Sequence, residues 1–253
     1  MNRPLVFIMA GGDGKRMCSD IPKVLHKIQD KPMIVHVIEN SYKLSPLKII
    51  IIVGKYHNII ENTIKDYIPI EIFNIIDFSI QQNALGTGDA IKCGVKDLKN
   101  NYNSNTPIII LSGDTPLVTP QTMKLLLEDL KNAKIMTTMV DEPSGYGRVI
   151  IQNNKFKKII EDKDCDTKQL LNKNINTGIY SITLNLLSKY IFEIDNNNSK
   201  GEYYLTDLFG ILVSNNISID FYQMEVENQI QLTGVNTKEQ LHKLNVLLQN
   251  NKE

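Results

Sequence analysis

A glycine-rich loop with several nearby cations follows the first apolar run of the chain. The segment Gly11-Gly12-Asp13-Gly14 comes directly after Leu5–Ala10, and Lys15, Arg16 and Lys23 follow it closely. Glycines let the backbone approach a ligand and direct its N–H groups at it, while the cations add positive charge. The loop therefore suits a polyanion, above all the phosphates of a nucleotide. The structural alternative is an ordinary glycine turn with surface cations nearby.

The spacing of this loop excludes two common nucleotide-binding motifs. A P-loop needs Gly-Lys-Ser/Thr, whereas Lys15 is followed here by Arg16. A dinucleotide fingerprint needs a third glycine where this sequence has Met17, and Pro22 interrupts the segment soon afterwards. The sequence thus predicts a phosphate loop of another kind.

A carboxylate follows a second apolar run. Asp114 lies in Gly113-Asp114-Thr115-Pro116, directly after the predicted strand that ends at Ser112. Ligands of open α/β sheets bind beyond the carboxyl ends of the strands, and Mg²⁺ takes one or two protein carboxylates together with substrate phosphates. Asp114 is therefore a candidate magnesium ligand. A simple turn-forming role for this Asp is the alternative.

A second glycine turn, Gly86-Thr87-Gly88, enters a predicted helix a few residues after Gln81. Close backbone approach and an amide that both donates and accepts would suit the edge of a uracil or thymine base. The alternative is purely structural, with Thr87 as the N-cap of the helix.

The second half of the chain carries hydroxyl, amide and carboxylate groups in short clusters, of the kind that bind sugar hydroxyls. They lie in Pro143–Arg148, Glu161–Lys163, Asn176–Gly178, Gly201–Asp207 and Gly234–Thr237. The same residue types also form turns, so composition alone does not decide. Neither a zinc-ligand pattern nor a Gly-x-Ser-x-Gly nucleophile motif is present in the sequence.

The elements that must position these groups alternate between strand-like and helix-like patterns in the first half. Strands are expected at Leu5–Met9, Lys48–Val53, Ile70–Ile76 and Pro107–Ser112, and helices at Pro32–Lys43, Ile59–Tyr67 and Thr87–Leu98. The second half predicts strands at Lys134–Val140, Arg148–Ile151, Phe156–Glu161, Gly178–Ile182 and Ile217–Gln223, and helices at Leu184–Phe192, Tyr204–Ser214 and Lys238–Gln249. This order indicates a layered α/β sandwich with right-handed crossovers.

Composition sets the remaining limits. The chain of 253 residues has a formal net charge of zero, so no global field recruits nucleic acid or an anionic membrane. Its three scattered cysteines and the lack of a signal peptide or membrane-length apolar run favour a cytoplasmic protein.

Taken in order, these segments resemble the sugar-1-phosphate nucleotidyltransferases, most closely the uridylyltransferase (UDP-N-acetylglucosamine pyrophosphorylase) domain of the bacterial bifunctional N-acetylglucosamine-1-phosphate enzymes. The matching motifs are Gly12-x-Gly14-x-Arg16-Met17, Pro22-Lys23-Val-Leu-His26, Leu85-Gly-Thr-Gly88, Gly113-Asp114-x-Pro-Leu117, Gly145-Tyr-Gly-Arg148, Asn176-Thr-Gly178, Gly201-Glu-Tyr-Tyr204-x-Thr-Asp207 and Gly234-Val-Asn236. The resemblance implies a three-layer, Rossmann-like nucleotidyltransferase fold with a mixed, mostly parallel sheet.

The resemblance also implies roles for individual residues. It places the nucleotide on Ala10, Gly11, Gly12, Gly14, Lys23, Gln81, Gly86 and Thr87. It places the sugar on Gly147, Glu161, Asn176, Tyr204 and Thr206. It gives catalysis to Arg16, Lys23 and Asp114, and a catalytic Mg²⁺ to Asp114 and Asn236.

The implied reaction joins UTP and N-acetylglucosamine-1-phosphate, giving UDP-N-acetylglucosamine and pyrophosphate by in-line attack at the α-phosphorus. The alternatives are another sugar-1-phosphate, dTTP in place of UTP, or a sugar-nucleotide sensor without catalysis. We expect one domain over residues 1–253, with a nucleotide-binding first half, a sugar-phosphate-binding second half and no hexapeptide-repeat acetyltransferase domain. A monomer or dimer is expected rather than a trimer.

Overall fold

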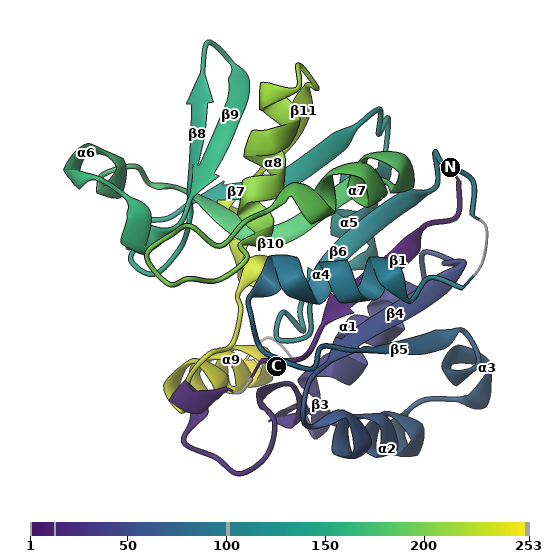
Figure 1. The fold of residues 1–253 in the computed structure, drawn as a ribbon. Helices are drawn as coiled ribbons and strands as arrows, with labels where there is room; N and C mark the ends of the chain where they lie inside the picture. Colours follow the sequence, from purple (N-terminus) through teal and green to yellow (C-terminus); the bar gives the residue numbers. More distant parts are fainter. Residues whose placement is uncertain (1, 13, 100–101, 251–253) are drawn as a thin grey trace.

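A mixed sheet forms the centre of the protein in the computed structural model, which describes residues 2–12, 14–99 and 102–250 (Figure 1). Within these residues nine strands join one sheet, and seven of them lie in the order β11-β7-β10-β6-β1-β4-β5. Their bounds are β1 (Leu5–Met9), β4 (Lys48–Val53), β5 (Ile76–Ile80), β6 (Pro107–Ser112), β7 (Ala133–Met139), β8 (Arg148–Gln152), β9 (Lys155–Ile160), β10 (Asn174–Thr183) and β11 (Ile219–Met224).

Along this row only β10 runs against the other strands. Strand β1 is parallel to β4 and β6, β5 is parallel to β4, and β7 is parallel to β11, whereas β10 is antiparallel to both β6 and β7. The predicted mixed, mostly parallel sheet is therefore confirmed. The β8–β9 hairpin lies off this row, pairs with the first part of β10 through Arg148 and Ile175, and projects away from the row (Figure 1).

Two helical layers cover the sheet because successive residues of its strands face opposite sides. Val6 and Ile8 pack with α1 (Met33–Tyr42), α2 (His57–Tyr67) and α5 (Pro120–Leu127). Leu5 and Phe7 pack on the other face with α4 (Thr87–Lys96), α7 (Leu184–Tyr190) and α8 (Leu205–Ser214), the three helices in front of the sheet in Figure 1. This arrangement confirms the three-layer α/β fold.

One predicted strand is wrong. The apolar run Ile70–Ile76 is split between a short helix, α3 (Ile70–Phe73), and the first residue of β5. Pro69 precedes that helix, and β5 is the half-exposed edge strand Ile76–Ile80. An edge strand with one solvated face alternates in polarity, so its sequence pattern is weaker than a continuous apolar run.

The C-terminal helix α9 (Lys238–Asn250) lies beside a segment from the start of the chain. It packs on the small β2 (Lys27–Ile28) and β3 (Lys31–Pro32) pair, where Leu244 contacts the cluster of Ile28 and Val235. Figure 1 shows these yellow and purple segments together. The contact fixes residues 234–237 next to the loop that follows β1. Across the described residues, none of the helices combines the length and apolar character that crossing a bilayer requires.

Candidate active site

Two cavities of about 310 Å³ each open at the carboxyl ends of β1 and β6. The first is lined by the glycine loop and the turn before α4, and the second is lined by residues of β10 and the start of α8. We call them the loop cavity and the β10 cavity. Their linings share Met9, Thr87, Ser112 and Asp114. A ligand in one cavity would therefore meet a ligand in the other at the ends of these strands.

The glycine loop forms one wall of the loop cavity. The backbone amide of Ala10 donates to the Ile52 carbonyl at 2.7 Å, which keeps the chain in line with the sheet as it turns. A Cβ on Gly11 would lie 3.3 Å from both Gln81 Oε1 and the Gly54 amide, so the strands approach here more closely than a side chain comfortably allows. Of the predicted nucleotide residues, Ala10, Gly11, Gly12, Lys23, Gln81, Gly86 and Thr87 line this cavity.

Gly14 and the cations beside it play a different part. Gly14 does not line the cavity; its φ is +61°, and a Cβ there would lie 2.7 Å from the Lys23 Cβ. Glycine at this position therefore lets the loop pass against Lys23, which begins the short 3₁₀ turn Lys23–Leu25. Arg16 is exposed, and the side chain of Lys15 lies outside the described part of the structure.

Lys23 joins the two predicted metal ligands. Its ammonium donates to an oxygen of the Asp114 carboxylate and, at 2.9 Å, to Asn236 Oδ1. Arg16 Nη2 donates to the same Asn236 oxygen at 3.1 Å. The structure thus brings together four residues that stand up to 220 positions apart in the sequence.

Hydrogen bonds of the backbone hold Asp114 and Asn236, the two predicted metal ligands, in place. The Val235 amide donates to the Asp114 carbonyl at 2.9 Å, and the Asn236 amide donates to Gln240 Oε1 at 2.7 Å. Among the described residues there is no group of three or more His, Cys, Asp or Glu side chains that could hold a metal. One carboxylate and one amide oxygen that already hold a cation nonetheless fit Mg²⁺, which completes its shell with water and substrate phosphates.

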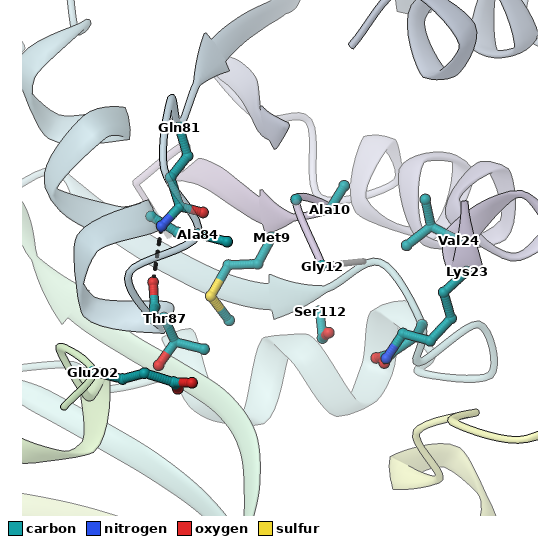
Figure 2. Close-up of a pocket in the computed structure, with 14 residues that line it drawn as sticks. Met9, Ala10, Gly12, Lys23, Val24, Gln81, Ala84, Thr87, Ser112 and Glu202 are labelled. Carbon is teal, nitrogen blue, oxygen red and sulfur yellow. Dashed lines mark hydrogen bonds and ion pairs between the residues drawn. The ribbon is translucent and has the colours of Figure 1, made fainter. Parts of the chain in front are cut away.

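The far end of the loop cavity carries Gln81. Figure 2 shows Gln81 and Thr87 at one end of this pocket and Lys23 at the other. The buried Gln81 amide donates to the Gly86 carbonyl at 3.0 Å and to Asp89 Oδ2 at 2.8 Å. Both amide hydrogens are then used, so Oε1 is the group left to accept a hydrogen bond from a ligand.

The turn between Gln81 and α4 is held against a distant segment. Gly88 N donates to the Tyr203 carbonyl at 2.7 Å, and Tyr203 N donates to the Leu85 carbonyl at 2.8 Å. Gly86 has φ +115°, and a Cβ there would lie 2.5 Å from the Tyr203 carbonyl oxygen. Only glycine tolerates both that conformation and that contact.

Thr87 is not the N-cap of α4. That position belongs to Gly86, and the Thr87 hydroxyl instead accepts from the Leu205 amide at 3.1 Å, at the start of α8. Neighbouring Glu202 also lines the loop cavity, with its carboxylate beside Thr87 in Figure 2. In the sequence, Glu202 is marked only by its place within Gly201–Asp207.

The β10 cavity gathers most of the predicted sugar residues, namely Gly147, Glu161, Asn176 and Thr206. The Thr206 hydroxyl donates to Glu161 Oε1 at 2.8 Å, and burial raises the pKa of Glu161 despite that bond. Asn176 lies where β10 shifts register, with Nδ2 donating to the Tyr180 hydroxyl at 2.7 Å. A register shift beside a site turns polar side chains of the strand toward a ligand.

Tyr204, the fifth predicted sugar residue, does not line this cavity. It is buried and is the N-cap residue of α8, and the Lys200 ammonium lies 5.8 Å from its ring centroid. Burial raises the pKa of its hydroxyl. Tyr204 is therefore a buried residue outside the lining of the cavity, at the position that begins α8.

Arg148 links two turns that contribute residues to the β10 cavity. Its side chain is 2% exposed and donates to the Tyr146 carbonyl and, at 3.0 Å, to Asp162 Oδ1. It thereby ties the turn that carries Gly147 to the turn that carries Glu161. In the sequence, Arg148 is marked only by its place in Gly145-Tyr-Gly-Arg148, and a lone arginine at a strand start gives little reason to expect such deep burial.

A second carboxylate lies close to Glu161. Asp207 is half-buried in the first turn of α8, and burial raises its pKa from 3.8 to about 6, with further contributions from the charges of Glu161, Asp195 and Asp164. Glu161 and Asp207 thus form a pair of carboxylates that each disfavour ionisation of the other.

The chain is similar to known proteins in both sequence and fold. The profile of the family described as MobA-like NTP transferase domain matches residues 6–171. A protein of Acanthamoeba polyphaga mimivirus, named "Probable UDP-N-acetylglucosamine pyrophosphorylase", is 41% identical over 244 residues that cover 93% of this chain and 92% of that protein. "Bifunctional protein GlmU" of Clostridium beijerinckii is 38% identical over 96% of this chain and 52% of that protein.

The chain thus spans about half the length of the bacterial relatives that it matches. Among solved structures, a UDP-glucose pyrophosphorylase complexed with UDP-glucose superposes with a TM-score of 0.73 at 18% identity, covering 98% of this chain and 99% of that one. At this identity the superposition shows a shared fold.

Proposed function

The chain belongs to the family of MobA-like NTP transferase domains, and from that membership we propose that it transfers the uridylyl group of UTP to N-acetylglucosamine-1-phosphate and releases pyrophosphate. The names of the mimivirus and clostridial relatives support this choice of substrates. So do the two cavities, one lined by the glycine backbone and Lys23 and the other by hydroxyls, amides and carboxylates.

One observation carries the proposal: the two cavities meet at Asp114. Its carboxylate lies at the end of β6, on the wall that both cavities share, and contacts Lys23. A nucleotide stretched from Gln81 to Lys23 would bring its phosphates to this wall (Figure 2). A sugar phosphate in the β10 cavity would reach the same place from the other side.

The reaction then needs no protein nucleophile. A phosphate oxygen of the sugar phosphate, ionised at neutral pH, forms a bond to the α-phosphorus of UTP, and the bond from that phosphorus to the bridging oxygen of pyrophosphate breaks. Lys23 and Arg16 hold the phosphates and offset the charge that develops on the leaving group. We propose that Asp114 and Asn236 hold Mg²⁺, which when bound supplies further charge neutralisation.

On the base, the remaining acceptor of Gln81 matches the N3–H of a uracil or thymine ring, so this contact alone does not separate UTP from dTTP. We propose a cytoplasmic setting, since the three cysteines of the described residues form no disulfide.

The test measures pyrophosphate release with UTP or dTTP and a panel of sugar-1-phosphates, with and without Mg²⁺. We expect release with UTP, N-acetylglucosamine-1-phosphate and Mg²⁺ together. In Asp114→Asn turnover should fall by at least about 100-fold while the melting temperature stays close to that of the wild type. Asp220→Asn, on the exposed side of β11, is the matched control and should keep wild-type turnover. No release with any acceptor would refute the enzymatic function.

A further inference from the structure

We propose that Lys23 is an internal cation that competes with a divalent metal for the oxygens of Asp114 and Asn236, so that the metal enters this site together with the nucleotide and binds poorly to the free protein. The inference rests on the proposed function for the identity of the nucleotide. The competition itself rests on the contacts described above.

The first support is that the lysine takes the atoms a metal would need. Its ammonium contacts an oxygen of the Asp114 carboxylate and lies 2.9 Å from Asn236 Oδ1, the only oxygen of that amide. The side chains of Lys23 and Asp114 are 17% and 10% exposed, so the contact is largely shielded from solvent. A metal ion bound to the same two oxygens must displace the ammonium.

The second support is the local charge. Among the described side chains, the cations Lys23 and Arg16 both donate to Asn236, and Lys23 also contacts Asp114. Within this group of four residues the Asp114 carboxylate is the single anion. A divalent ion added to this group is repelled by the cations, and partial burial weakens the screening of that repulsion. A triphosphate adds several negative charges and reverses the balance.

The third support is that the lysine is the movable part of the cluster. Asp114 and Asn236 are fixed by the backbone bond between Val235 and Asp114 and by the bond from Asn236 to Gln240. Lys23 holds its charge at the end of a flexible four-carbon stem and already lines the loop cavity. Phosphates in that cavity can therefore draw the ammonium off the two oxygens without moving them.

The experiment titrates Mn²⁺ into the free protein and follows bound metal by electron paramagnetic resonance, with no nucleotide present. We expect Lys23→Met and Lys23→Gln each to bind one Mn²⁺ roughly tenfold or more tightly than the wild type, because one nearby positive charge is removed. The gain should vanish in the double variant Lys23→Met/Asp114→Asn. Lys124→Met, which removes an exposed lysine on α5, should match the wild type.

Equal Mn²⁺ affinities in the wild type and in both Lys23 variants, with circular dichroism showing that all are folded, would overturn the competition. So would a gain in Lys23→Met that survives the loss of the Asp114 carboxylate. Because no substrate enters this titration, its outcome is independent of the pyrophosphate assay. A protein without transferase activity could still show the competition, and an active enzyme could lack it.

Discussion

Replacing Asp207 by Asn should stabilise the protein, and only above mildly acidic pH. Asp207 lies half-buried at the start of α8, where burial, followed by the charges of Glu161, Asp195 and Asp164, raises its pKa from 3.8 to about 6. The folded protein therefore holds this proton more tightly than the unfolded chain does. Above pH 6 the side chain is ionised in both states, and burial of that charge lowers the unfolding free energy by an amount that no longer changes with pH.

The size of the effect follows from the pKa shift. A shift of about 2 units corresponds to a ceiling of about 3 kcal/mol, and solvent screening of a half-buried group reduces it to about 1–1.5 kcal/mol. Between pH 4 and pH 6 the folded state binds more protons than the unfolded state, so this contribution to stability falls as pH rises. An asparagine does not titrate and escapes that loss.

The assay is urea unfolding of the wild type and Asp207→Asn at several pH values from 5 to 8. We expect the unfolding free energy of the variant to exceed that of the wild type by about 1 kcal/mol at pH 7.5, and by clearly less at pH 5. Asp220→Asn, which changes an exposed aspartate on β11, should show a difference near zero throughout. A difference that is the same at every pH would refute the reasoning, because it would not come from the proton.

Two further variants test the walls of the cavities. Gly86→Ala should lower the unfolding free energy by about 1–3 kcal/mol and raise the KM for UTP, because residue 86 has a φ of +115° and the new Cβ would lie 2.5 Å from the Tyr203 carbonyl oxygen. The control Gly210→Ala, with open space around the new methyl group, should show neither effect in urea unfolding and kinetics. Thr206→Val removes the donor to Glu161, so the KM for the sugar phosphate should rise about tenfold with little change in the KM for UTP. The bond also holds the pKa of Glu161 down, so the loss in the Thr206 variant should grow toward acidic pH in a kcat/KM profile; equal changes in both KM values would contradict its place on the sugar side.

The sequence predicted the fold best where the strands are buried on both faces. Runs such as Lys48–Val53 carry a continuous apolar signal, and the order of strands and helices then limits the topology to a few possibilities. The edge strand β5 was missed because three of its five residues are not buried, and the apolar run before it belongs largely to α3.

The residues of the site could be predicted where glycines and strand ends mark them in the sequence. Residues whose position depends on tertiary packing were harder to predict. Most predicted residues reach the walls of the two cavities because they follow strands that end at the same edge of the sheet. The burial of Tyr204 outside the cavity lining and the burial of Arg148 depend on tertiary packing. Such contacts leave no local pattern in a sequence.

The hydrogen bonds between the turn before α4 and residues 203–205 have a consequence for engineering the two specificities. The turn that would hold the base and the segment that leads into the sugar side are joined by two backbone bonds and by the Thr87 hydroxyl. The segments that would set base preference and sugar preference therefore cannot be exchanged independently of each other. A chimera that exchanged the second half alone would have to reproduce the backbone path at Tyr203, or it would distort the nucleotide end that it was meant to leave untouched.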